Sequence, residues 1–162
     1  MSLEQRCQRM RLPSPFPPLF SYACDALDIS CCCTLQVSGP SMFPTFSGQN
    51  EFVVVQAVSP LLGPITKGDV VICVRPVDPS EHIVKRVSAI AGEEVLLFPT
   101  KDNPDLQKVK VPKGHVWLQG DNLLHSRDSR EYGPIPLALV KGRVLYQVWP
   151  TWKIISHEEL GG

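Results

Sequence analysis

A serine and a lysine in this chain lie in surroundings where the pair could cleave an acyl bond. Ser41 stands in the uncharged stretch Ser38-Gly39-Pro40-Ser41-Met42-Phe43-Pro44-Thr45. Pro40 fixes its own φ and lacks an N–H, and Pro44 favours an extended Phe43, so we expect Ser41 in a stiff, strand-like run. A hydroxyl held in this way loses little entropy when it is aimed at a carbonyl carbon. The alternative is an ordinary serine in a proline-rich loop.

Lys85 is the candidate base that would take the serine proton. It lies in residues 82–90, which have the β-branched content of a strand. Because side chains alternate along a strand, Lys85 is the only charge on its face, whereas Arg86 can point to water from the other face. The Lys85 face otherwise carries Ile83, Val87 and Ala89. Burial among such groups lowers a lysine pKa and favours the neutral amine that a general base needs. The alternative is a lysine whose amine reaches solvent or forms an ordinary ion pair.

Composition limits the classes of protein to which the chain can belong. Its 162 residues suit one domain, and the hydrophobic fraction of 43% is that of a globular protein. Lys plus Arg equals Asp plus Glu at 16 each, so no basic field indicates nucleic acid binding. The 16 prolines, together with short apolar runs, indicate a mainly β body with rigid connections.

The N-terminal region differs from the rest of the chain. Residues 1–18 are weakly basic and rich in proline, and residues 19–37 are mostly apolar but contain Asp25 and Asp28. Each carboxylate would cost about 2.5–3.5 kcal/mol at the middle of a bilayer, which argues against a standalone transmembrane helix. A short anchor, an interfacial segment and a partner-shielded helix stay open. We therefore expect four parts: an arm at 1–18, an apolar, helical, membrane-proximal segment at 19–37, a catalytic domain at 38–155 and a tail at 156–162.

The cysteines do not form a metal-binding pattern. The chain has six cysteines, three of them adjacent at positions 31–33, and no C-x-x-C pair. No second ligand cluster joins them to the histidines at zinc spacing, so we assign no metal and no cofactor.

Short apolar runs after residue 50 predict a series of strands. They cover residues 52–58, 69–75, 82–90, 95–98, 108–111, 116–119 and 143–149, with a proline-framed turn or short helix at 135–140. We expect coiled antiparallel sheets that form a sandwich-like or partly open barrel.

A third stretch, residues 120–134, packs charged residues and a histidine between turn residues. Four boxes then occur in order: Ser38 to Thr45, Gly68-Asp69-Val70-Val71, Lys85-Arg86-Val87 followed by Gly92, and Gly120-Asp121-Asn122 with Ser126, Asp128, Ser129, Arg130, Gly133 and Pro134. These boxes resemble those of the type I signal peptidases, over roughly residues 36–150.

The resemblance implies a Ser–Lys dyad endopeptidase that removes sorting or signal peptides from membrane-tethered preproteins. In this comparison Ser41 matches the nucleophile, Lys85 the general base and Ser126 a hydroxyl that orients the lysine amine. Asp128 and Arg130 resemble a supporting buried ion pair, and Asp121 and Asn122 belong to the same turn, where a purely structural role stays open. The Ser41 N–H is the natural oxyanion donor. Many bacterial relatives carry a serine two positions before the nucleophile, where this chain has Gly39, so the second donor stays open between a backbone group and water.

Further similarity is to the mitochondrial inner membrane branch of that family. It is carried by Gly39-Pro40-Ser41, Gly114-His115-Val116-Trp117, Gly133-Pro134-Ile135-Pro136 and Val148-Trp149-Pro150. This similarity implies a catalytic domain that faces the intermembrane space and a hetero-oligomer with a related second subunit. Substrate is expected to bind extended along a strand edge beside Ser41. Between Gly92 and Val111, where larger bacterial relatives insert a second β domain, the chain has room only for a hairpin.

Three other interpretations are open to test. A histidine, His82, His115 or His125, could serve Ser41 as base, although no G-x-S-x-G elbow is present. Self-cleaving repressors share a Ser–Lys core, but a DNA-binding module would precede it and the Asp128–Arg130 box would be missing. The chain could also be a non-catalytic or regulatory subunit of a membrane protease complex.

Overall fold

Antiparallel strands make up most of the protein. The computed structural model describes residues 32–57, 63–97 and 106–155. Its strands are β1 (Cys32–Val37), β2 (Glu51–Ala57), β3 (Val70–Arg75), β4 (Asp78–Ile90), β5 (Glu94–Leu97), β6 (Gln107–Lys110), β7 (His115–Gln119), β8 (Ile135–Pro136), β9 (Val140–Trp149) and β10 (Lys153–Ile154). One short helix, α2 (Ser129–Tyr132), and three 3-10 turns, η2 (Pro40–Met42), η4 (Leu123–His125) and η5 (Leu137–Leu139), are described alongside them.

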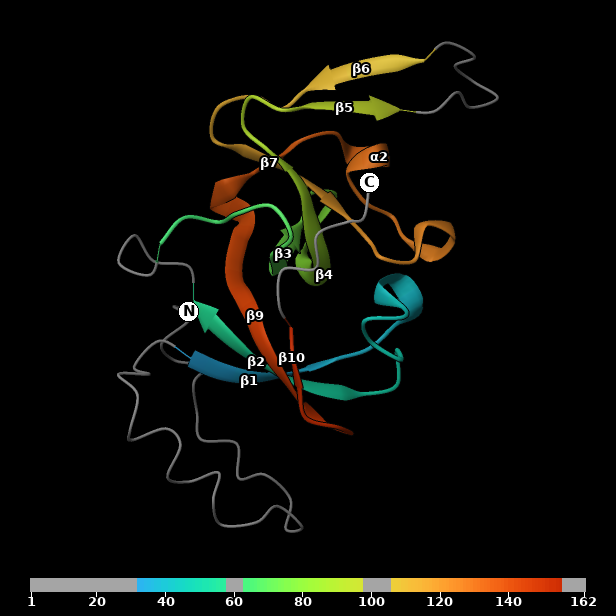
Figure 1. Cartoon of the computed structure of the whole chain (residues 1–162), viewed down its shortest axis with the longest axis vertical. Coiled ribbons are helices and arrows are strands. Elements are labelled where there is room, and N and C mark those ends of the chain that lie inside the picture. The colour runs from blue at the N-terminus through green and yellow to red at the C-terminus, as the bar shows by residue number, and fades with distance from the viewer. Residues whose placement is uncertain (1–31, 58–62, 98–105, 156–162) are drawn as a thin grey trace.

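One bent sheet runs in the order β1-β2-β9-β3-β4-β7-β8, and β10 pairs with β9. The long strand β9 joins its two parts: residues 142–149 pair with β2, and residues 140–143 pair with β3. Figure 1 shows β9 running along the molecule between the β1–β2 pair and the β3–β4 pair. Strands β5 and β6, both within the segment between Gly92 and Val111, pair with each other in a separate two-stranded sheet. The coiled antiparallel β class is confirmed.

The seven predicted strands all form, with ends shifted by a few residues, but an additional strand precedes them. Residues 32–37 belong to the segment predicted to be helical, and instead they pair with β2 as β1. From Thr34 to Val37 exposed and half-buried side chains alternate, which is the period of a strand. The helical prediction is therefore wrong for this part.

The rest of the predicted N-terminal and C-terminal parts falls beyond what the structure covers. Residues 1–18, 19–31 and 156–162 lie outside the described residues. Within the described ranges, no helix has the length and apolar character needed to cross a membrane.

The core fixes the two segments that carry the candidate dyad. Met42 and Phe46, which flank the serine turn, are only 2% and 3% exposed and pack on a cluster from β2, β3 and β9. Burying each such side chain contributes roughly 1.5–3 kcal/mol, so the turn is anchored on the sheet. On β4 the predicted apolar face is buried, because Ile83, Val87 and Ala89 all lie in the core.

Candidate active site

Ser41 lies in the 3-10 turn η2 rather than in the strand-like run predicted for it. Gly39 precedes the turn with φ 107°, a region that glycine enters readily, and Pro40 is the first helical residue, where its fixed φ is favourable. Phe43 then leaves the turn in an extended conformation, as Pro44 predicts. The serine is therefore held by a turn between two prolines.

The Lys85 side chain reaches the Ser41 hydroxyl. Its Nζ lies 2.8 Å from Ser41 Oγ and donates to the Val84 carbonyl oxygen at 2.9 Å. Lys85 is only 3% exposed, as expected from its place on the apolar face of β4. Two residues 44 positions apart in the sequence thus come within one hydrogen bond of each other, with the lysine buried and the serine half-buried.

Burial is the main cause that lowers the pKa of Lys85 below its usual value, and Arg75 adds to this effect. The charges of Asp128, Cys73 and Asp121 oppose it, with Asp128 the strongest of the three. Because desolvation outweighs them, the neutral amine becomes available at a lower pH than in a free lysine.

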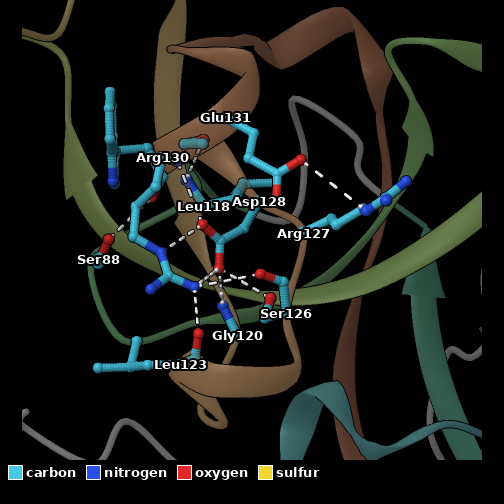
Figure 2. Close-up of polar contacts among 11 residues, drawn as sticks. Ser88, Leu118, Gly120, Leu123, Ser126, Arg127, Asp128, Arg130 and Glu131 are labelled. Atoms are coloured by element: carbon cyan, nitrogen blue, oxygen red, sulfur yellow. Dashed lines mark hydrogen bonds and ion pairs between the residues drawn. The ribbon is translucent and has the colours of Figure 1, made fainter. Parts of the chain in front are cut away.

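A network of hydrogen bonds surrounds the carboxylate of Asp128, which is fully buried (Figure 2). Asp128 accepts hydrogen bonds from the Gly120 N–H at 3.0 Å and the Ser126 hydroxyl at 2.7 Å, and it pairs with the Arg130 guanidinium at 2.9 Å. Burial would raise the pKa of Asp128, but these bonds together lower it, so the carboxylate stays charged. The predicted ion pair forms, with the Arg130 side chain 33% exposed, and the Ser126 hydroxyl donates to Asp128.

Arg86 was predicted to point to water, but the structure buries it. It is 3% exposed, and its guanidinium donates to both carboxylate oxygens of Asp121, at 2.9 and 2.8 Å. It also donates to the Gly68 carbonyl at 3.0 Å and to the Thr45 hydroxyl at 3.1 Å, and that hydroxyl donates to Asp121. Arg86 and Thr45 were missed because the prediction treated the second face of β4 as solvent-exposed. The signal that could have predicted this ion pair was the presence of opposite charges, Arg86 and Asp121, in two of the sequence boxes that resemble the family.

Two residues join the loop of residues 120–128 to the serine turn. A Cβ on Gly120 would lie 2.5 Å from the Ser41 carbonyl oxygen and would also collide with Ser126, so only glycine fits there. The Asn122 N–H donates to the same Ser41 oxygen at 3.0 Å, and its side-chain amide donates to the Pro40 carbonyl at 3.1 Å. In Figure 1 the cyan turn η2 accordingly lies beside the orange loop of η4.

The model of the family described as signal peptidase, peptidase S26, matches residues 26–101 and 97–149. The chain belongs to this family.

Relatives of the chain are 34–44% identical to it over the residues that align. The mitochondrial inner membrane protease subunit 1 of Schizosaccharomyces pombe is 42% identical over 114 residues, which cover 70% of this chain and 71% of the relative. Subunit 1 from Homo sapiens is 44% identical over 113 residues, 70% of this chain and 67% of the relative. Subunit 2 from Mus musculus is 34% identical over 122 residues, 73% of this chain and 67% of the relative. The chain is thus a protease of the signal peptidase type.

Membership of the signal peptidase family decides against the self-cleaving repressor interpretation. The described contacts of the three candidate histidines do not include Ser41. The His115 ring contacts the Lys113 carbonyl at 3.2 Å, and the His125 ring faces Asn122 at 3.4 Å, while His82 lies exposed on β4.

Across the three described ranges, no group of three His, Cys, Asp or Glu side chains could hold a metal ion.

Proposed function

We propose that this signal peptidase family member cleaves peptide bonds with Ser41 as nucleophile and Lys85 as general base. One observation carries the proposal: the Lys85 amine lies 2.8 Å from the Ser41 hydroxyl while only 3% of Lys85 is exposed. A nucleophile and a base within hydrogen-bonding reach, with burial lowering the pKa of the base, meet the two requirements of this chemistry.

The reaction begins when neutral Lys85 accepts the Ser41 proton as Oγ attacks the scissile carbonyl carbon. The tetrahedral intermediate carries its negative charge on the former carbonyl oxygen. Protonated Lys85 then gives its proton to the leaving amine, and an ester to Ser41 remains. Water attacks this ester with Lys85 again as base, which releases the acid and restores the hydroxyl.

The Ser41 N–H is the donor that we assign to the oxyanion. In the 3-10 turn the Phe43 N–H donates to the Pro40 carbonyl, so the N–H of Ser41 is not used within the turn. Gly39 has no hydroxyl to offer. A fixed backbone N–H directed at the developing charge is among the larger contributions to such a reaction.

Asp128 is proposed to support the base. Its charge opposes the fall of the Lys85 pKa, and it stabilises the lysinium that forms when Ser41 is deprotonated. Ser126 and Arg130 hold this carboxylate in place through their hydrogen bonds. Removing either side chain would weaken the hold on Asp128, but Ser41 and Lys85 would both remain in place.

We assign extended peptide substrates to an edge of the sheet. β1 ends the strand order, so none of the other described strands pairs with one of its sides, and it leads directly into the serine turn. A peptide could add to such an edge by main-chain hydrogen bonds and place alternate side chains towards the site.

The relatives' names point to the cellular setting that we propose. The substrates are membrane-tethered mitochondrial preproteins whose sorting peptides are removed, at the inner membrane, with the catalytic domain in the intermembrane space. A related second subunit is the expected partner, since relatives named subunit 1 and subunit 2 both match this chain. The second candidate, a non-catalytic or regulatory subunit, is favoured only by the word subunit in those names.

Cleavage of a tethered preprotein tests the proposal. The full chain is compared with Ser41→Ala, Lys85→Met and, as the control for a histidine base, His115→Ala. We expect loss of cleavage in the first two variants and retention in the third, with circular dichroism showing that all remain folded. Cleavage that survives in Lys85→Met would reject the dyad. A folded but inactive wild type, with its partner present, would favour the non-catalytic role.

A further inference from the structure

The peptide unit between Pro40 and Ser41 is held from outside the serine turn. Its N–H belongs to Ser41 and is the oxyanion donor of the proposed mechanism. Its carbonyl oxygen, on Pro40, accepts the side-chain amide of Asn122 at 3.1 Å as well as the Phe43 N–H at 3.2 Å. The first of these bonds comes from the loop of residues 120–128.

The Asn122 amide has a defined direction. Only its NH₂ end can donate to the Pro40 carbonyl, and its Oδ1 then lies 3.4 Å from the His125 ring nitrogen. The Asn122 main-chain N–H separately donates to the Ser41 carbonyl at 3.0 Å. Asn122 thus holds the carbonyl before Ser41 with its side chain and the carbonyl after it with its backbone.

We propose that the Asn122 side chain is a positioning residue for the oxyanion, an inference that rests on the proposed function. A peptide unit is planar, so a bond that fixes the Pro40 oxygen also fixes the direction of the Ser41 N–H. Hydrogen bonding at the carbonyl end also polarises the unit and strengthens the N–H as a donor. Both effects act on charge that develops only in the transition state, so they favour kcat rather than substrate binding.

The structure separates this role from simple anchoring of the loop. The main-chain bond from Asn122 to Ser41 uses no side-chain atom, so Asn122→Ala and Asn122→Asp both keep its donor. The hydrogen bonds of Lys85 go to Ser41 and Val84, and the Asn122 side chain takes no part in them. Replacement of Asn122 by alanine should therefore leave the hydrogen bonds of Lys85 as they are.

The experiment compares the full chain with Asn122→Ala and Asn122→Asp in preprotein cleavage. Asn122→Ala should lower kcat about tenfold with KM unchanged, less than the 100-fold or more lost when an oxyanion donor is deleted outright. Asn122→Asp should lose more, because a carboxylate cannot donate to the Pro40 oxygen and repels it. Arg127→Gln is the matched control: it removes one positive charge from the same loop, at a side chain 76% exposed, and should keep wild-type kcat.

A peptide aldehyde gives a readout that loop damage alone would not give. It forms a hemiacetal with Ser41 whose oxygen occupies the oxyanion position, so its affinity should fall in parallel with kcat in both Asn122 variants. The acidic limb of the pH–rate profile should not move in Asn122→Ala, which adds no charge, and the limb is measured in that variant. Wild-type kcat in Asn122→Ala, undiminished aldehyde affinity or a shifted limb would each overturn the inference. A Ser41→Ala chain as active as wild type would instead show that the proposed function has failed, and the inference with it.

Discussion

Two arginine–aspartate pairs flank the candidate dyad, and they are built differently. The Arg86–Asp121 pair is nearly closed to water, with side chains 4% and 11% exposed, and it joins segments that lie far apart in the sequence. The Asp128–Arg130 pair spans two positions of one loop, and its arginine is 33% exposed. The first pair can hold separate segments together, whereas the second shapes a single loop.

This difference assigns the pairs different tasks. Through Arg86 and Thr45 the first pair ties the segment that follows the serine turn to the strand of Lys85, so we expect it to set the distance between Ser41 and Lys85. Asp128 instead acts on Lys85 through its charge, more strongly than Asp121 does. We therefore expect the first pair to govern stability and geometry, and the second to govern the pH dependence of activity.

The largest expected effect is on stability in Arg86→Met. It leaves the Asp121 carboxylate buried without its cation, so the free energy of unfolding should fall by roughly 3–5 kcal/mol. Urea unfolding measures this, with Arg86→Met/Asp121→Leu as the matched control. The double variant should regain most of the stability but not the cleavage activity, since Thr45 loses its tie to β4. Full activity in the double variant would contradict the positional role.

Arg130→Met should destabilise the chain far less. Asp128 keeps the hydrogen bonds from Gly120 and Ser126, and the lost guanidinium is partly in water, so about 1 kcal/mol is expected. The same urea experiment applies. A loss as large as that of Arg86→Met would remove the distinction between the two pairs.

Asp128→Asn sharpens the comparison through pH dependence. The charge of Asp128 raises the Lys85 pKa, so its removal should move the acidic limb of the kcat/KM profile to lower pH. Asp121→Asn should move the limb in the same direction by less, because it is the weakest contributor. A limb that moves to higher pH in Asp128→Asn, or further in Asp121→Asn, would contradict this assignment.

The strand that carries Lys85 could be predicted because the alternation of side chains that indicates it is a local pattern in the sequence. Alternation along β4 places Lys85 among Ile83, Val87 and Ala89, and burial of that face follows from the pattern alone. The same reasoning failed for Arg86, because alternation says which residues share a face but not whether loops cover it. The loops that carry Thr45 and Asp121 do cover it.

Turn conformation and strand partners were harder to predict for a related reason. Pro40 suits the first position of a helical turn as well as an extended run, and the 3-10 turn is held by burial of Met42 and Phe46. Cys32–Val37 continues an apolar segment, and only its pairing with β2 makes it a strand. Both outcomes depend on contacts with residues distant in the sequence.

The most direct test of a buried, neutral base is a titration of the Lys85 amine itself. NMR of the labelled side chain in the full chain gives its pKa, and the acidic limb of kcat/KM gives the pKa that activity requires. Because burial lowers the Lys85 pKa, we predict that the two values coincide below the pKa of a free lysine and that the limb is absent in Lys85→Met. An amine that titrates like free lysine, or a limb that persists without it, would contradict the account.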